Sequence, residues 1–132
     1  MDRNMAKKTT EEIPDPRTLL PLTPAVFHIM LALAGGERHG YGIMQEVERL
    51  TKGRLNLGPG TLYRSIQRML VDGLIEETKD VHGSEEDDER RRYYRLTKFG
   101  FDVAFEESRR LESLVNAARE RKLLSWLNES QS

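Results

Sequence analysis

Cysteine is absent from this chain of 132 residues. Its absence excludes a disulfide framework, a thiolate nucleophile and a cysteine-ligated zinc site. Long apolar runs are also missing, and residues 1–20 contain no apolar stretch of the kind that forms the centre of a secretory signal. We therefore expect a protein that does not span a membrane and that works in the cytoplasm.

The chain also lacks a strong net charge and the residue patterns of common enzymes. The formal net charge is −1 and the pI is about 6.3, although 33% of the residues are charged. Balanced signs leave room for one basic face, and nucleic-acid binding needs only local positive charge. There is no serine–histidine–aspartate setting, no glycine-rich phosphate loop and no metal-ligand cluster. We expect no catalytic site, no metal and no cofactor.

Turn residues and apolar spacing divide the chain into four segments. Residues 1–20 are polar, aperiodic and contain two prolines, which predicts a flexible arm. Residues 21–97 are predicted to form the folded domain, residues 98–128 a long C-terminal helix, and residues 129–132 a tail. Within the domain, Thr23 is predicted to cap a first, apolar helix, and His39 a second one.

A third helix is predicted to begin at Pro59. Its inward row follows helical spacing and consists of Leu62, Ile66 and Met69. Its outward side is polar and consists of Thr61, Arg64, Ser65 and Arg68. This outward side contains no acid, although 22 of the 132 residues are aspartate or glutamate. Two arginines without an acid favour DNA contact over a merely solvated face.

A two-stranded hairpin is predicted after the third helix. Residues 74–79 and 90–96 have strand composition, and the tip at residues 80–89 is strongly acidic. If Tyr94 and Leu96 face the core, strand alternation places Arg95 on the other side. Arginines 90–92 are predicted to touch the DNA backbone, with an ion-paired hairpin as the alternative. The acidic tip would repel phosphate, so we do not expect it to enter a groove.

A helix of this kind joined to a basic hairpin is typical of a winged helix-turn-helix, in which the helix enters the major groove and the hairpin contacts the flanking backbone. The predicted fold class is mainly α with a small β-hairpin: a winged helix-turn-helix domain plus one long C-terminal helix. Thr97 is predicted to cap that helix, which would reach about residue 127.

The long helix is apolar along one side. Its apolar stripe, at near-heptad spacing, consists of Phe101, Ala104, Phe105, Leu111, Leu114, Val115 and Ala118. Left unpaired, this stripe would face water. We therefore interpret it as the seam of a homodimer.

Three motifs in order resemble the PadR family of bacterial transcriptional regulators: H-G-Y at residues 39–41, G-T-L-Y at 60–63 and R-R-Y-Y-x-L-T at 91–97. The resemblance covers about residues 22–100. It implies a homodimer that represses a nearby operon by binding a pseudo-palindromic operator in double-stranded DNA. The DNA-binding residues that it implies are Tyr41, Thr61, Tyr63, Arg64, Ser65, Arg68, Gly83, Arg90, Arg91 and Arg92. For Tyr63, core packing and DNA contact are both open.

The resemblance also implies that a small aromatic or cationic effector releases many such proteins from DNA. The candidate effector residues are Phe27 and Met30 of the first helix, which would face the partner's long helix, and Trp126, the only tryptophan. For Trp126, plain apolar packing is the alternative.

A second function from another class is a winged-helix module that binds protein and no longer binds DNA. The near-zero net charge and the acidic tip favour it. The acid-free side of the third helix favours DNA binding.

Overall fold

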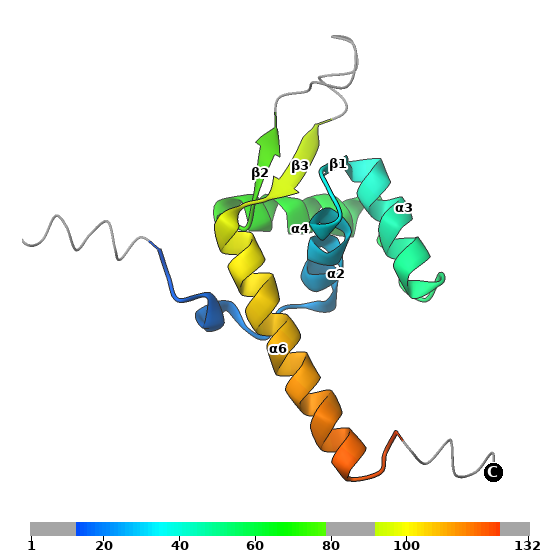
Figure 1. The fold of residues 1–132 in the computed structure, drawn as a ribbon. Helices are drawn as coiled ribbons and strands as arrows, with labels where there is room; N and C mark the ends of the chain where they lie inside the picture. The colour runs from blue at the N-terminus through cyan, green and yellow to red at the C-terminus, as the bar shows by residue number, and fades with distance from the viewer. Residues whose placement is uncertain (1–12, 79–91, 125–132) are drawn as a thin grey trace, which may run out of the picture.

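Four α-helices, one 3₁₀ helix and a small sheet make up the part of the chain that the computed structural model describes, residues 13–78 and 92–124 (Figure 1). In chain order the elements are η1 (Pro16–Leu19), α2 (Pro24–Ala34), β1 (Arg38–His39), α3 (Gly40–Thr51), α4 (Pro59–Val71), β2 (Ile75–Thr78), β3 (Tyr93–Leu96) and α6 (Lys98–Glu120). Helices α2, α3 and α4 pack together with the sheet, and α6 extends away from them. The predicted fold class is confirmed.

The helices begin where the sequence predicts caps. Pro24 and Pro59 occupy the first turns of α2 and α4, where a backbone N–H has no partner within the helix. Three side chains accept a hydrogen bond from the backbone N–H three residues later, at 3.2, 3.0 and 2.9 Å: Thr23 before α2, His39 before α3 and Thr97 before α6. Each of these bonds satisfies a donor that the helix start leaves unpaired.

The sheet has the strand order β1–β3–β2, and both strand pairs are antiparallel. Tyr94 and Leu96 are buried and Arg95 is exposed, so the predicted alternation along β3 is confirmed. The sequence does not predict β1, because two residues are too few for an alternating pattern. The acidic tip, with residues 79–91, lies outside the described ranges.

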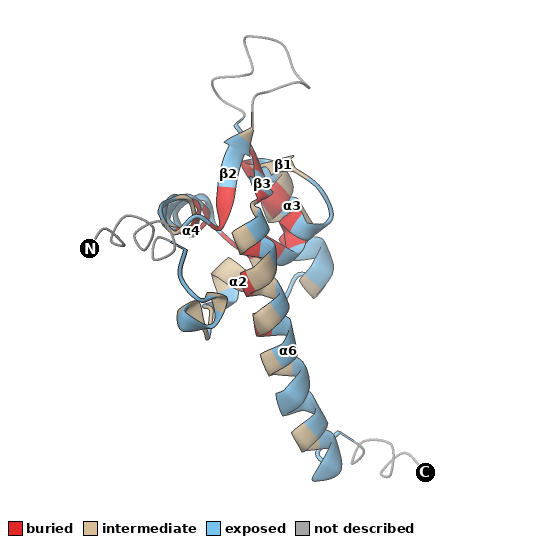
Figure 2. Cartoon of the chain, turned by 60° about the vertical axis from the view of Figure 1, so that its left-hand side comes forward, coloured by how far each residue is buried: buried red, intermediate tan, exposed pale blue. Residues whose placement is uncertain are grey.

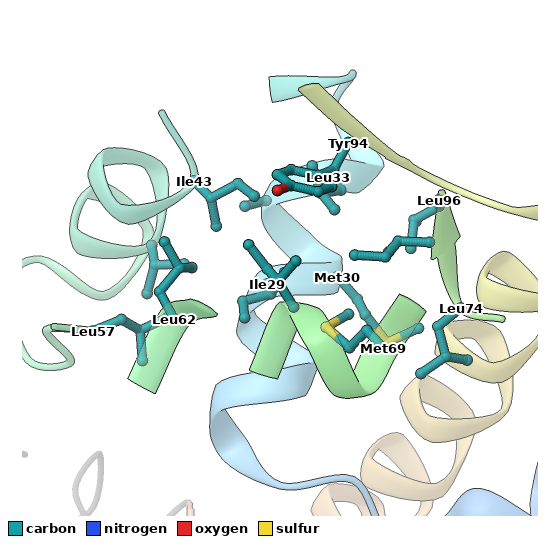
Figure 3. Close-up of a cluster of buried hydrophobic side chains, with 14 of the residues drawn as sticks. Ile29, Met30, Leu33, Ile43, Leu57, Leu62, Met69, Leu74, Tyr94 and Leu96 are labelled. Carbon is teal, nitrogen blue, oxygen red and sulfur yellow. The ribbon is translucent and has the colours of Figure 1, made fainter. Parts of the chain in front are cut away.

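Helix α2 lies at the centre of the hydrophobic core (Figure 3). It packs against α3, α4, α6 and β3, which explains why its sequence is apolar on nearly every side. Met30 is fully buried in this core. It therefore packs within its own subunit, and the role in effector binding that the sequence suggests for it stays a prediction. The inward rows of the neighbouring helices complete the core with Ile43, Val47, Leu62, Ile66 and Met69.

The segment before α2 packs along α6. The 3₁₀ helix η1 contacts α6, and the buried carboxylate of Glu107 accepts a hydrogen bond from the backbone N–H of Leu22 at 3.0 Å. Arg110 donates to both oxygens of the same carboxylate at 2.6 and 3.1 Å. The flexible arm predicted for residues 1–20 therefore excludes Pro16–Leu19, and residues 1–12 lie outside the described ranges. Sequence spacing cannot reveal this contact, because its two ends lie 85 positions apart.

Helix α6 ends at Glu120, earlier than the predicted residue 127. Lys122 has a left-handed backbone with a φ of 64°. Its N–H and that of Leu123 donate to the carbonyls of Arg119 and Ala118, respectively. This Schellman arrangement closes a helix by satisfying its last carbonyls. The sequence does not signal it, because the glycine that usually occupies this position is absent.

A backbone junction of four residues, here called the α4–α6 junction, joins the end of α4, the base of the hairpin and the start of α6: Gly73, Leu74, Thr97 and Gly100. The Leu74 carbonyl accepts a hydrogen bond from the Thr97 N–H at 3.1 Å, and the Thr97 hydroxyl donates to the Gly73 carbonyl at 2.6 Å. Gly73 has a φ of 78°, which favours glycine. Gly100 is buried, and a Cβ there would overlap the Leu74 carbonyl oxygen. Glycine at position 100 therefore lets α6 approach the hairpin base closely.

Substitution of Gly100 by alanine tests this junction. The added Cβ would meet backbone, which cannot rotate away, so we expect a loss of about 1–3 kcal/mol in the free energy of unfolding, as for other overpacked cores. Urea denaturation followed by circular dichroism measures it. Gly60→Ala is the matched control, because Gly60 also lies in the first turn of a helix and its added Cβ would meet nothing within 4 Å. Equal stability of the two variants would contradict the close approach.

The buried carboxylate of Glu107 predicts a pH dependence of stability. The hydrogen bonds from Arg110 hold the pKa of Glu107 below its ordinary value of 4.5, and the Leu22 N–H contributes in the same direction. The stabilisation is therefore complete above pH 4.5 and is lost as the pH falls through the lowered pKa. We expect Glu107→Gln to lower the free energy of unfolding by about 1–2 kcal/mol at pH 7. The difference from wild type should narrow in acid.

Denaturation curves between neutral and acidic pH, at one protein concentration, measure this effect. The control is Glu112→Gln, which changes an exposed glutamate of the same helix. A stability difference between wild type and Glu107→Gln that stays constant across the pH range would show that the charge of Glu107 is not what stabilises the contact.

Candidate nucleic-acid interface

The outward side of α4 is exposed as predicted. Thr61, Arg64 and Arg68 are exposed and Ser65 is half-buried, while the opposite row of the helix is fully buried. The Arg68 guanidinium lies 3.3 Å from the carboxylate of Asp72, one turn further along. Arg64, in contrast, forms no ion pair with any other residue in the ranges 13–78 and 92–124. Of the two arginines on this side of α4, Arg64 is therefore the one whose guanidinium no carboxylate of the described residues holds.

Tyr63 connects the third helix to the second. Its ring and hydroxyl lie against the backbone of Gly40, where a Cβ would overlap them. The side chain is nevertheless 45% exposed. The ring of Tyr63 thus packs in part against the start of α3, as core packing requires. The rest of the side chain faces solvent and leaves a DNA contact possible. The contact also explains why glycine follows His39 in the H-G-Y motif.

Aromatic rings support the start of α3. The His39 ring stacks on Tyr41 with centroids 6.4 Å apart and meets the Tyr93 ring edge-on at 5.4 Å. His39 also lies opposite Tyr93 in the β1–β3 pair. Tyr41 is 61% exposed at the end of this series. The structure thus holds Tyr41 on the surface next to the hairpin. Tyr41 is one of the DNA-binding residues that the resemblance implies.

The arginines of β3 and its approach are ion-paired across the hairpin. Arg92 lies 2.9 Å from Glu77, and Arg95 lies 2.7 Å from Glu76. The ion-paired hairpin, left open by the sequence, is therefore present in the protein without DNA. The remaining predicted wing residues, Gly83, Arg90 and Arg91, lie outside the described part of the chain.

Tyr94 packs beneath this hairpin. It is buried, and its burial raises the pKa of the phenol, which the nearby carboxylate of Glu77 raises further. The ring therefore stays neutral at physiological pH and serves the core.

Helix α6 is largely exposed where it extends beyond the domain (Figure 2), and several residues of its apolar stripe are exposed with it. Phe101, Phe105 and Leu114 are more than half exposed, and Val115 is 43% exposed. Ala104 differs, because it packs against the core of its own domain. Leu111 and Ala118 are half-buried. A row of large apolar side chains on a single helix is the kind of surface that another protein surface covers.

The effector residues suggested by the sequence do not form one described site. Phe27 is half-buried, Met30 is enclosed in the core, and Trp126 lies outside the described residues. Within residues 13–78 and 92–124, no three histidine, aspartate or glutamate side chains are placed to hold a metal ion. None of the helices in these ranges has the length and apolar character needed to cross a membrane.

The sequence does not predict several residues of this interface. Gln67 lies on α4 beside the hairpin, and Glu76 and Glu77 of β2 face the arginines. Arg38 of β1 donates to the Ala32 carbonyl at 2.9 Å and thereby ties the end of α2 to the sheet. The glutamate–arginine pairs could be predicted only if the register of the two strands were known. A long tip between the strands does not fix that register, so the sequence does not give it.

Comparisons with known proteins agree with this geometry. The model of the Transcriptional regulator PadR-like family matches residues 29–104. A transcriptional regulator of Mycobacterium tuberculosis, Rv3488, is 36% identical over 89 residues, which are 67% of this chain and 76% of that protein. A PadR-like transcription factor of Bacteroides fragilis has 27% identity and a TM-score of 0.55, covering 72% of this chain and 86% of its own.

A further solved structure shows the fold alone. A PadR family transcription regulator of Clostridium difficile has 21% identity and a TM-score of 0.62, covering 74% of this chain and 97% of its own.

Proposed function

Because the chain belongs to the PadR-like family of transcriptional regulators, whose members are not enzymes, we propose that it is a homodimeric repressor that binds a specific operator. In this proposal α4 enters the major groove, and the hairpin contacts the flanking backbone. The observation that carries it is the exposed, acid-free side of α4, with Arg64 unpaired among the described residues. An arginine fork there can bond two acceptors of guanine.

Dimerisation is the second part of the proposal. Two recognition helices must lie about 34 Å apart to enter successive major grooves of B-DNA. A two-fold dimer would achieve this spacing by joining the apolar stripes of two α6 helices, and its operator would be pseudo-palindromic. The protein would act in the cytoplasm, on the DNA that it regulates.

Release by an effector is the third part. A small aromatic or cationic molecule that binds between α2 and the partner's α6 would favour one dimer geometry over another. Phe27 of α2 is half-buried and Leu31, one turn later, is 43% exposed, so both can contribute to such a site. A change in the angle between the subunits would alter the spacing of the two recognition helices and lower operator affinity.

Arg64→Ala tests the recognition helix. We expect the affinity for DNA from the region upstream of its own gene to fall about tenfold or more, since a base contact of arginine contributes about 1–3 kcal/mol. Arg68→Ala should cost less, because Arg68 is already held by Asp72. Fluorescence anisotropy at constant salt measures both. Arg121→Ala, at the end of α6 far from α4, removes the same charge as the control (Figure 1).

Two results would count against this part of the proposal. Unchanged affinity and sequence preference in both α4 variants would exclude α4 as the reader. Failure of the wild-type protein to bind any DNA would favour a protein-interaction module.

Phe105→Glu tests the dimer. Phe105 is 57% exposed in the single subunit, so the substitution should leave the helix content unchanged while placing a charge in the seam. We expect a monomer by analytical ultracentrifugation at micromolar concentration, where the wild type sediments as a dimer. Ser113→Glu adds the same charge to another exposed position of α6 and should remain dimeric. A Phe105→Glu variant that stays dimeric would exclude the stripe as the seam.

A further inference from the structure

A polar cleft lies between the recognition helix and the hairpin. It has a volume of about 390 Å³ and is lined by Tyr63 and Gln67 of α4, Glu77 of β2, Arg92 just before β3, and Tyr94 of β3. Gln67 and Arg92 are exposed, and Tyr94 closes the floor. In a winged helix-turn-helix the DNA backbone passes between these two elements.

The two glutamates of β2 occupy opposite faces of the hairpin. Glu77 lies opposite the buried Tyr94, and Glu76 lies opposite the exposed Arg95. Successive residues of a strand point to opposite sides, so only Glu77 faces the cleft and α4. Each glutamate pairs with an arginine at a similar distance, 2.9 Å for Glu77 and 2.7 Å for Glu76. Their side chains are also similarly exposed, at 40% and 47%. They occupy opposite faces of the hairpin.

We propose that this cleft binds a phosphodiester of the DNA backbone and that Glu77 competes with this phosphate for Arg92. The inference rests on the proposed DNA-binding function and adds a contact site to it. The Arg92 guanidinium and the Gln67 amide are both donors, and they lie on the two sides of the cleft. A guanidinium binds carboxylate and phosphate through the same forked geometry, so the two anions exclude one another at Arg92.

This competition weakens binding to every DNA sequence alike. Phosphate contacts carry no base information, so the cost of displacing Glu77 from Arg92 is the same for every sequence, and the base contacts of α4 are unchanged. The ratio of specific to non-specific affinity therefore stays the same. Glu77 sets the overall affinity for DNA without touching a base.

Glu77→Gln tests the competition, because removing the competing carboxylate should raise the affinity for DNA. A variant that failed to fold would instead lose affinity. The probe is a fluorescently labelled duplex of arbitrary sequence and about 30 base pairs, which spans three turns of B-DNA. We expect affinity to rise about three- to tenfold at low salt. The slope of log affinity against log salt should steepen by about 0.9 for each additional phosphate neutralised.

Glu76→Gln is the matched control, because it removes the same charge and an ion pair of similar length from the other face. We expect its affinity to stay within about twofold of wild type, since exposed charges that are not adjacent to the phosphate are screened. Gln67→Ala provides the opposite test. Loss of its donor should weaken binding about three- to tenfold, the range of one typical hydrogen bond, without changing the salt slope.

The outcomes separate the two proposals. If Glu77→Gln and Glu76→Gln raise affinity equally, net charge explains the gain and the cleft is not a phosphate site. If Glu77→Gln binds no better than wild type, or Gln67→Ala binds as well as wild type, the cleft assignment is wrong while DNA binding stands. If wild type and Glu77→Gln both fail to bind the duplex and upstream DNA, the proposed function itself fails.

Discussion

At the α4–α6 junction, the Leu74 carbonyl accepts the N–H of Thr97 while Gly100 packs against the same carbonyl, with no side chain between them. The end of α4, the base of the hairpin and the first turn of α6 are therefore held together by backbone contacts. Backbone contacts of this kind have little freedom to adjust. The direction of α6 relative to α4 is set here, and so the placement of two recognition helices in a dimer would follow from it.

Charge in this protein is organised locally. The net charge is −1, yet no acid occurs within α4 and the nearest one along the chain, Asp72, caps its C-terminal end. In the hairpin beside it, Arg92 and Arg95 form ion pairs with the two glutamates of β2. The exposed side of α4 therefore carries arginine without acid. A protein that is nearly neutral as a whole can have such a local basic face.

Much of the fold could be predicted from the sequence because its signals are local. Thr23, His39 and Thr97 are capping residues that act within three positions, and the rows of α4 follow from helical spacing. Other features depend on contacts between distant segments and leave no such pattern. Strand β1 exists only because β3 lies beside it, η1 packs against α6, and Glu107 of α6 holds the backbone of Leu22 between η1 and α2. The early end of α6 also lacks a local signal, since a lysine adopts the conformation that glycine usually provides.

For the candidate site, the sequence by itself determined which side chains α4 exposes, because helical periodicity separates Arg64 and Arg68 from the buried row whatever the surroundings. It also determined that one side of α6 is apolar. Only the tertiary structure decided that Met30 is enclosed in the core and that Glu77 faces the recognition helix while Glu76 does not. The reason is physical: periodicity assigns residues to faces of one element, whereas burial and ion pairing depend on which other element packs against that face.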